Sequence, residues 1–335
     1  TTKSLADGPP SADPRYLLPS ANSVVSFAVS LDRHLAKDFI SKKKWRPHCD
    51  NRKAIAQKLY KIGEALAGQL RSEGHESISV DLNNNYRPEK AAADITEMTD
   101  FHPEFSHRYA ALAAGIGRLG WSGNLLTKEY GALVELGSVL TSANLTSDPP
   151  IADEKHPCDR CKMCSLVCPV GMIQPKTSTQ VRVAGVTETL SRKRPNTCCW
   201  IGCTGYEGLA ASGSWSNWSP YRLGHRLPED KQELDELCIS LQKADPQMQD
   251  ANNSLTNYRQ AVLDQDWFYY TVCGFCRSVC SARREDRLAN RKLIINSGTA
   301  ALKLEVTPQI TADQTMRDPR TRGRALSSGI DGRSR

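Results

Sequence analysis

The chain carries a run of closely spaced thiols, Cys158-Asp159-Arg160-Cys161-Lys162-Met163-Cys164-Ser165-Leu166-Val167-Cys168-Pro169. The spacing C-x2-C-x2-C-x3-C-P is typical of proteins with two [4Fe-4S] cubes, in which the first three cysteines ligate one cube and the fourth usually ligates the other. A second run must then supply further ligands. Cys273-Gly274-Phe275-Cys276-Arg277-Ser278-Val279-Cys280 repeats the spacing C-x2-C-x3-C. The two runs predict a domain built around two iron–sulfur cubes.

The two runs leave one ligand unassigned. Two cubes need eight thiolates, and the runs supply seven. The segment between them contains Cys198, Cys199 and Cys203, so we expect the eighth ligand there and favour Cys199. The predicted metal ligands are therefore one of these three cysteines together with Cys158, Cys161, Cys164, Cys168, Cys273, Cys276 and Cys280.

Zinc and disulfide bonds are the alternatives for so many cysteines. Zinc ribbons use two separated pairs of thiols and have no need of a third close thiol followed by x3-C-P. A count of 12 cysteines in 335 residues is far below the density of a disulfide-stapled secreted domain. Cys49 and Cys238 lie apart from both runs, and we expect no role for them at the metal site.

Length and composition describe an ordinary folded chain. With 335 residues, of which 39% are hydrophobic, it can bury a sizeable core and form two domains. It has no run of about 18 apolar residues, so no segment is expected to span a bilayer. The net charge of +7 comes from short basic groups such as Arg192-Lys193-Arg194. These are typical of a solvated surface, and we do not expect nucleic acid as a partner.

Residues 1–20 are rich in Ser, Pro and Ala and lack the apolar core of a secretory signal. We expect them to form a flexible N-terminal segment. The chain does not begin with Met, which leaves open a removed leader. The cytoplasm is therefore favoured as its location over an exported or membrane-associated one.

The pattern of apolar residues predicts a mixed fold of the α+β class. Strands are expected over residues 24–29, 77–82 and 131–141, and helices over residues 105–112, 228–241 and 255–264. A longer helix is expected over residues 51–70, because Ile55, Leu59 and Leu66 recur at helical spacing, and Gly74 is placed to end it. Strand, helix and strand in this order indicate an α/β layer.

Domain boundaries follow from composition. The α/β layer occupies residues 21–150, and Pro149-Pro150 marks the linker to a cluster-binding domain over residues 151–300. That domain contains an aromatic-rich insertion at about residues 198–265, which is expected to wall a pocket or to shield the clusters. Residues 301–335 are rich in Arg, Ser and Gly and are expected to form a flexible tail.

Four glycines fall close together between residues 114 and 124. Gly115, Gly117 and Gly120 fit the dinucleotide fingerprint G-x-G-x-x-G. That fingerprint should follow a strand and open a helix, whereas this segment follows an expected helix, so a dinucleotide site is not expected. Glycines in such close succession still allow the backbone to approach a ligand closely.

Three segments, together with the two cysteine runs, resemble the superfamily of cobalamin-dependent reductive dehalogenases and epoxyqueuosine reductases. They are Asp100-Phe101-His102-Pro103, residues 113–127 and Leu136-Gly137-Ser138-Val139-Leu140-Thr141. The resemblance covers about residues 20 to 295. It implies a nitroreductase-like α/β domain that holds a base-off cobalamin and a ferredoxin-like domain that delivers electrons from two [4Fe-4S] cubes.

The resemblance also implies roles for particular residues. One cube is assigned to Cys158, Cys161, Cys164 and Cys280, and the other to Cys168, Cys273, Cys276 and one cysteine of the 198–203 group. The corrinoid is expected to lie against Gly115, Gly117, Leu119, Gly120, Trp121 and Asn124. Asp100 is the expected proton donor, with His102 and Tyr109 as weaker candidates. His102 is not expected to ligate cobalt, because Phe105 stands where that motif has glycine.

The substrate is less well defined by these motifs. Asn124-Leu125 replaces the Lys-Asn pair of epoxyqueuosine reductases, and Cys198-Cys199-Trp200-Ile201 replaces their Arg-Cys-Ile-Ser-Tyr segment. We therefore expect a reductive dehalogenase-like enzyme that acts on a small organic substrate, with an epoxyqueuosine reductase acting on tRNA as the alternative. A non-catalytic electron carrier or corrinoid activase is the alternative from another class. The expected electron donor is a ferredoxin, a flavodoxin or a membrane quinol route.

Overall fold

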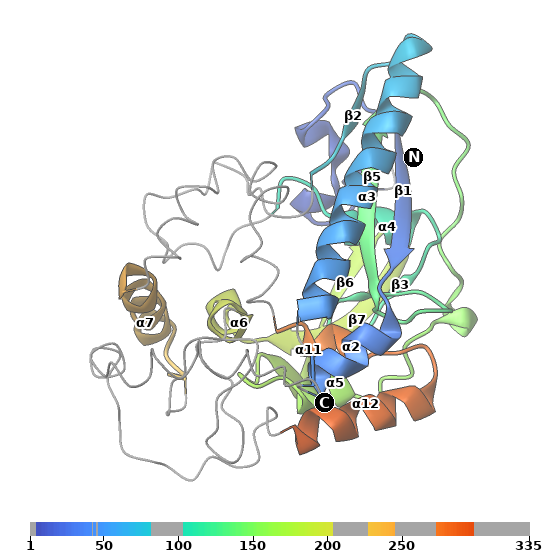
Figure 1. Ribbon diagram of the computed structural model, residues 1–335. Helices are drawn as coiled ribbons and strands as arrows, with labels where there is room; N and C mark the ends of the chain where they lie inside the picture. The colour runs from blue at the N-terminus through green and yellow to red at the C-terminus, as the bar shows by residue number, and fades with distance from the viewer. Residues whose placement is uncertain are drawn as a thin grey trace.

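A three-stranded antiparallel sheet forms the centre of the N-terminal half (Figure 1). The computed structural model describes residues 5–41, 43–44, 46–81, 103–203, 227–244 and 273–297. The sheet has the order β1 (Ser23–Ser30), β5 (Val134–Thr141), β2 (Ser77–Ser79), with Ser26 opposite Ser138 and Ile78 opposite Leu140. The expected strands are confirmed, although β2 and β5 are shorter than the sequence pattern suggested.

Helix α3 (Arg46–Ser72) runs along one face of this sheet, as Figure 1 shows. Its buried Ala67 and Leu70 pack on Val139 of β5. The helix ends at Gly74, whose φ of +87° suits glycine, and the amide of His75 donates to the Leu70 carbonyl at 3.0 Å. The predicted helix and its glycine terminus are therefore confirmed.

The opposite face of the sheet is covered by α4 (His107–Ala113). Leu140 alternates with Val139 along β5, so its side chain points to the other face, where it packs with Phe105 and Ala110. Short 3-10 turns η1 (Pro10–Ala12) and η2 (Pro14–Tyr16) precede β1. The sheet is thus enclosed between helices, which confirms a mixed fold of helix and sheet.

The N-terminal segment differs from our expectation. We predicted that residues 1–20 would be flexible, yet within the described part, residues 5–20, Leu5 and Ala12 are 2% and 0% exposed. Both pack with Val183 of a later hairpin. Proline starts each 3-10 turn, and the Asp13 side chain accepts a hydrogen bond from the Arg15 amide, so local turns fix the segment against the core.

Two small antiparallel pairs connect the halves of the molecule. The glycine-rich segment forms β3 (Arg118–Leu119) and β4 (Leu125–Leu126), and the chain after the first cysteine run forms the hairpin β6 (Ile173–Val183) and β7 (Val186–Lys193). β3 lies against β7. Leu119 and Leu125 are buried in the same cluster as Val183, so the glycine-rich segment packs on the hairpin.

The cysteine-bearing elements gather at one end of the sheet (Figure 1). They are η5 (Asp153–Lys155), α5 (Met163–Leu166), α6 (Asn196–Cys203), α7 (Lys231–Ala244), α11 (Phe275–Ser278) and α12 (Arg284–Asn296). α11 and α12 contact α5 and also α2 (Arg33–Ile40), which joins the cysteine-bearing end to the N-terminal half. α7 confirms the helix expected over residues 228–241.

Several predictions concern residues outside the described ranges: the helix over 255–264, the tail over 301–335 and most of the aromatic-rich insertion. Nitroreductase-like and ferredoxin-like architectures remain predictions from the resemblance. Among the helices of the described ranges, none is both long and apolar enough to cross a membrane.

Candidate iron–sulfur site

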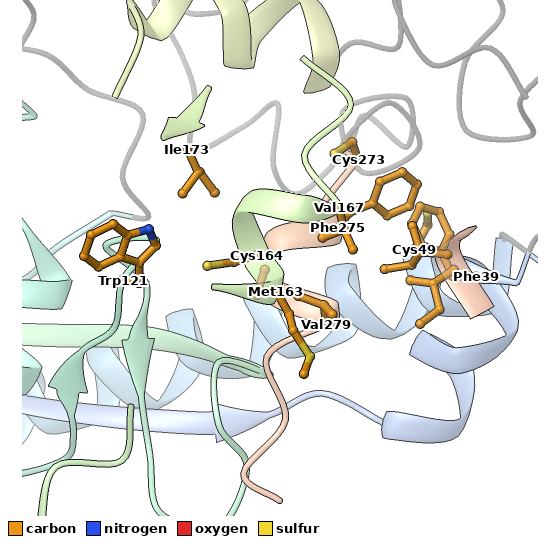
Figure 2. Packing of buried hydrophobic residues seen from close by; sticks show 13 residues of the cluster. Phe39, Cys49, Trp121, Met163, Cys164, Val167, Ile173, Cys273, Phe275 and Val279 are labelled. Atoms are coloured by element: carbon orange, nitrogen blue, oxygen red, sulfur yellow. The ribbon is translucent and has the colours of Figure 1, made fainter. Parts of the chain in front are cut away.

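The two cysteine runs fold into matching loops. In each, a residue with positive φ, Lys162 at +59° or Gly274 at +60°, precedes a short helix, α5 or α11. The positions that follow also match, because Met163 and Val167 are buried in one loop as Phe275 and Val279 are in the other. Figure 2 shows these four side chains packed together between the loops. The repeated sequence spacing therefore corresponds to a repeated local structure.

The first thiol set consists of Cys158, Cys161, Cys164 and Cys280, which line one cavity. Three come from the first run and the fourth from the end of the second run. Burial raises the pKa of the Cys280 thiol well above its usual range, and the neighbouring Cys164, Cys158 and Cys161 raise it further. Apolar walls around the cavity include Leu126, Met163 and Val279. The structure thus brings together the four cysteines that the resemblance assigned to one cube.

The second thiol set is defined as Cys168, Cys199, Cys273 and Cys276. Burial raises the pKa of Cys168 to about 11, and Cys276 and Cys199 raise it further. Cys273 is 8% exposed and lies in the same buried cluster as the loop that carries Cys276. Of the candidates for the eighth ligand, Cys199 acts on both Cys168 and Cys276.

The two other candidates for the eighth ligand are placed differently. Cys198 is fully buried in a cluster with Leu234 and Cys238. The side chain of Cys203 lies outside the described residues. Cys238 and Cys49 are likewise buried among apolar side chains, where burial raises the pKa of each thiol to about 12.

The chemistry of both thiol sets fits cubes. In the described part of the chain, no three His, Cys, Asp or Glu side chains gather closely enough to hold a single metal ion. A cube spreads its four thiolates over four irons and needs a wider arrangement. Backbone and side-chain donors point at the sulfurs: the Trp121 amide lies 3.4 Å from Cys158 Sγ, and Asn124 Nδ2 lies 3.6 Å from Cys276 Sγ. Such donors stabilise thiolate ligands.

The glycine-rich segment lies against the protein's own chain. A Cβ on Gly115 would lie 2.6 Å from the Pro149 carbonyl oxygen, and one on Gly120 would lie 2.6 Å from Leu126 Cδ1 and 3.5 Å from Cys158 Sγ. A Cβ on Gly117 would overlap the Leu126 backbone. These glycines are therefore required for close packing beside the first thiol set.

This packing bears on the expected corrinoid. Leu119 is buried in the core, while Trp121 and Asn124 donate toward cysteine sulfurs. The described surroundings of the six residues that we expected to face the ring thus do not fit a flat macrocycle. Sequence reasoning missed their contacts with the thiols, because the contacts depend on how β3 and β4 fold over the first cysteine run.

A buried polar network holds the start of the first cysteine run. Arg118 is 1% exposed, and its Nε donates to Glu188 Oε1 at 2.6 Å. The other oxygen, Glu188 Oε2, lies 3.0 Å from His156 Nε2. The Cys158 amide donates to His156 Nδ1 at 3.0 Å, so this nitrogen is unprotonated and Nε2 carries the proton. His156 thus links Glu188 to the backbone of the first ligand.

The charge of Glu188 is maintained by this network. Burial, the largest single influence, raises its pKa, but hydrogen bonds from His156 and Arg118 together bring the pKa below its usual value. Arg118 also donates to Asp153 Oδ1 at 2.9 Å and to the Ile151 carbonyl at 2.6 Å. The network was not predicted, although a histidine two residues before Cys158 was a signal in the sequence.

The expected proton donors are not brought to the thiols in the described structure. Asp100 and His102 lie outside the described residues. Tyr109 packs against the cluster that contains Leu119 and Val183, and burial raises the pKa of its hydroxyl. Its role as a proton donor remains a prediction.

Comparison with known proteins gives matches in one direction. No family model matches the chain. Over 164 residues it is 28% identical to the epoxyqueuosine reductase of Synechococcus sp. (strain CC9605), a match that covers 48% of this chain and 44% of that protein. Over 60 residues it is 45% identical to the epoxyqueuosine reductase of Atelocyanobacterium thalassa (isolate ALOHA), which covers 18% and 19%. The matched stretches span less than half the length of these relatives.

Solved structures give weaker likenesses. An epoxyqueuosine reductase with an epoxyqueuosine-modified tRNA-Tyr stem loop aligns with a TM-score of 0.38 at 17% identity, over 86% of this chain and 68% of that chain. A reductive dehalogenase aligns with a TM-score of 0.41 at 18% identity, over 73% and 32%. The sequence matches confirm the predicted resemblance: this chain is similar to the epoxyqueuosine reductases and to the superfamily that contains them.

Proposed function

We propose that the chain is an oxidoreductase in which two [4Fe-4S] cubes pass single electrons toward a bound substrate. The observation that carries this proposal is the first thiol set, in which Cys280 of the second run lines the same cavity as Cys158, Cys161 and Cys164. Such an exchange of ligands between runs is the hallmark of two-cluster domains. The second thiol set, completed by Cys199, supports it.

The comparisons favour our alternative substrate over our first choice. The curated relatives reported above are named epoxyqueuosine reductases, and none is named a dehalogenase. We therefore propose an epoxide in a modified tRNA nucleoside as the substrate. Our expectation that nucleic acid is not a partner has no support from these relatives.

The reaction follows from this substrate class. Reducing an epoxide to an alkene breaks two C–O bonds, consumes two electrons and two protons and releases water. The cubes supply the electrons one at a time, each drawn from an external low-potential donor. Asp100 stays the proposed proton donor. Cobalamin stays a proposed cofactor on the resemblance alone, since the described glycine-rich residues do not fit it.

The test is anaerobic reconstitution of the protein with iron and sulfide. We expect about eight irons per chain, followed by turnover of epoxyqueuosine-containing tRNA when cobalamin and a reductant are added. Cys161→Ala should lose one cube, whereas the matched control Cys49→Ala should keep both. Zinc in place of iron, or no loss of iron in Cys161→Ala, would contradict the proposal.

Two further arms of the same experiment separate the alternatives. Turnover of aryl or alkyl halides without turnover of the tRNA would identify a dehalogenase. Two cubes with fast electron exchange, no turnover of either substrate class and no binding of cobalamin would identify an electron carrier.

A further inference from the structure

Two cations lie beside the second thiol set. Arg108 on α4 donates from its NH1 to the Gly123 carbonyl oxygen at 3.2 Å. Lys193, the last residue of β7, places its Nζ 3.0 Å from where a Cβ on Gly123 would be. The absence of a side chain at Gly123 therefore leaves room for the ammonium, and both cations meet at this glycine.

Both cations act on the same sulfur. Burial and the neighbouring Cys199 raise the pKa of the Cys276 thiol, whereas the Asn124 hydrogen bond, Lys193 and Arg108 lower it. The Lys193 ammonium is influenced in turn by Cys199, Cys276 and Cys164. Part of the Lys193 side chain is exposed, yet desolvation by the surrounding chain, followed by Arg108, lowers the pKa of its ammonium.

Neither cation has a carboxylate partner within the described part of the chain. Lys193 makes no ion pair there, and the Arg108 guanidinium donates to a carbonyl group. Two positive charges this close to one another repel, so an anion beside them is needed to stabilise the arrangement. A cube with four thiolates carries net negative charge and stands at the sulfur that both cations influence.

The cations around the first thiol set are compensated differently. Arg287 lines the cavity of that set, but its NH2 lies 2.6 Å from Asp159 Oδ2. Asp159 also pairs with Arg284 at 3.1 Å. Lys162 lies over the Trp121 ring at 4.6 Å from its centroid. The carboxylate of Asp159 therefore offsets positive charge at the first set, whereas no described carboxylate does so at the second.

We propose that Lys193 and Arg108 raise the reduction potential of the second cube and so direct electrons to it from the first. This inference rests on the proposed function. Reducing a cube adds one negative charge, and uncompensated cations nearby stabilise the reduced form. The transfer is one electron: the first cube is oxidised from [4Fe-4S]+ to [4Fe-4S]2+, the second is reduced by the reverse change, and no bond or proton is exchanged.

The test is a redox titration of the reconstituted protein monitored by EPR. In the wild type, the second cube should have the higher midpoint potential. Lys193→Gln should lower the ratio of reduced to oxidised second cube about tenfold at a fixed poise, which corresponds to about 59 mV for one electron. Arg108→Gln should shift it in the same direction, and Lys193→Arg, which keeps the charge, should restore it.

A control and a simplified background assign the signals. Arg192→Gln removes an exposed charge from the neighbouring position of β7 and should leave both potentials unchanged. Cys280→Ala should retain only the second cube, so the shift caused by Lys193→Gln can be measured there without overlap. Because the titration in the wild-type background stands alone, poor folding of Cys280→Ala does not remove the test.

The outcomes separate this inference from the proposed function. Two cubes whose potentials do not move in Lys193→Gln or Arg108→Gln would overturn the inference and leave the proposed function standing. A first cube with the higher potential in the wild type would also overturn it. Failure to bind two cubes at all would overturn the proposed function itself.

Discussion

Arg118 is 1% exposed although its guanidinium carries a full positive charge, and Glu188, its main partner, is 2% exposed. Removing one member of a buried ion pair leaves the other charge uncompensated, which costs more than an intact pair contributes. Arg118 joins β3, β7 and the segment before Cys158, so the cost would fall on the contact between the glycine-rich segment and the first cysteine run.

Glu188→Gln is therefore expected to lower the free energy of unfolding by about 3 kcal/mol, because Arg118 loses its buried carboxylate and retains only Asp153. Anaerobic chemical denaturation of the loaded protein measures this. The control is Asp153→Asn, whose side chain is 87% exposed; a pair of this kind contributes about 1 kcal/mol or less. Equal losses in the two variants would contradict the importance of the buried pair.

Gly131 is a second residue with a defined structural requirement. Its φ is +59°, and a Cβ there would overlap the backbone at Cys280 and Ser281, beside the 2.8 Å hydrogen bond from the Ala132 amide to the Cys280 carbonyl. Gly131→Ala should displace Cys280 and reduce bound iron by about one cube, as iron analysis would show. Gly171→Ala is the matched control, because Gly171 has φ +61° with no atom near a Cβ, so only the conformational cost of about 1–2 kcal/mol applies.

At the scale of elements, α4 is attached to the sheet by a buried histidine. His107 Nδ1 lies 2.9 Å from Ser138 Oγ on β5, and Nε2 lies 2.9 Å from the Asp81 carbonyl oxygen. Burial lowers the pKa of His107 from 6.5 to about 4. Between these values the unfolded chain binds a proton that the folded chain does not, so the free energy of unfolding falls as the pH is lowered.

From pH 7.5 to pH 5, His107 should therefore remove about 2 kcal/mol of stability. His107→Asn should make the free energy of unfolding less dependent on pH over this range by about that amount, as denaturation at both pH values would measure. His34, which is exposed, provides the control substitution His34→Asn. An unchanged pH dependence in His107→Asn would show that the histidine is not held neutral by the fold.

Periodicity predicted the long elements well, because α3 and β5 each bury one face and repeat apolar residues at the spacing of that face. It failed where tertiary contacts replace periodicity. Residues 5–20 appeared flexible, since the partner of Leu5 and Ala12, Val183, lies far along the chain. The glycines of 115–120 indicated an approach to a ligand, yet the approaching atoms belong to Pro149 and Leu126.

At the scale of the whole molecule, the two thiol sets each draw on both cysteine runs. If Cys158 and Cys280 serve one cube, the double variant Cys158→Ala/Cys280→Ala should lose about as much iron as either single variant, about four atoms per chain. Cys158→Ala/Cys276→Ala should lose nearly all of it. Iron and sulfide analysis decides between these outcomes, and additive losses from Cys158 and Cys280 would contradict the assignment.

Sequence spacing predicted both the seven cysteines of the runs and the exchange between them, since three thiols and x3-C-P carry that information by themselves. Cys199 was one of three candidates, because the orientation of a cysteine on α6 depends on its helix packing on α7. Lys193 and His156 act on the site only after the hairpin β6–β7 folds against β3, so no local pattern distinguishes Lys193 from its exposed neighbour Arg192.

The place of Cys280 in the first thiol set has a consequence for biosynthesis. A nascent chain that has exposed Cys158, Cys161 and Cys164 to the solvent still lacks the thiol that closes their cavity, and this thiol is synthesised only after most of the protein has left the ribosome. The second set likewise waits for Cys273 and Cys276. Neither cofactor can be completed during translation, so insertion of iron and sulfide must follow release of nearly the entire polypeptide, and the early run must stay protected from oxidation until then.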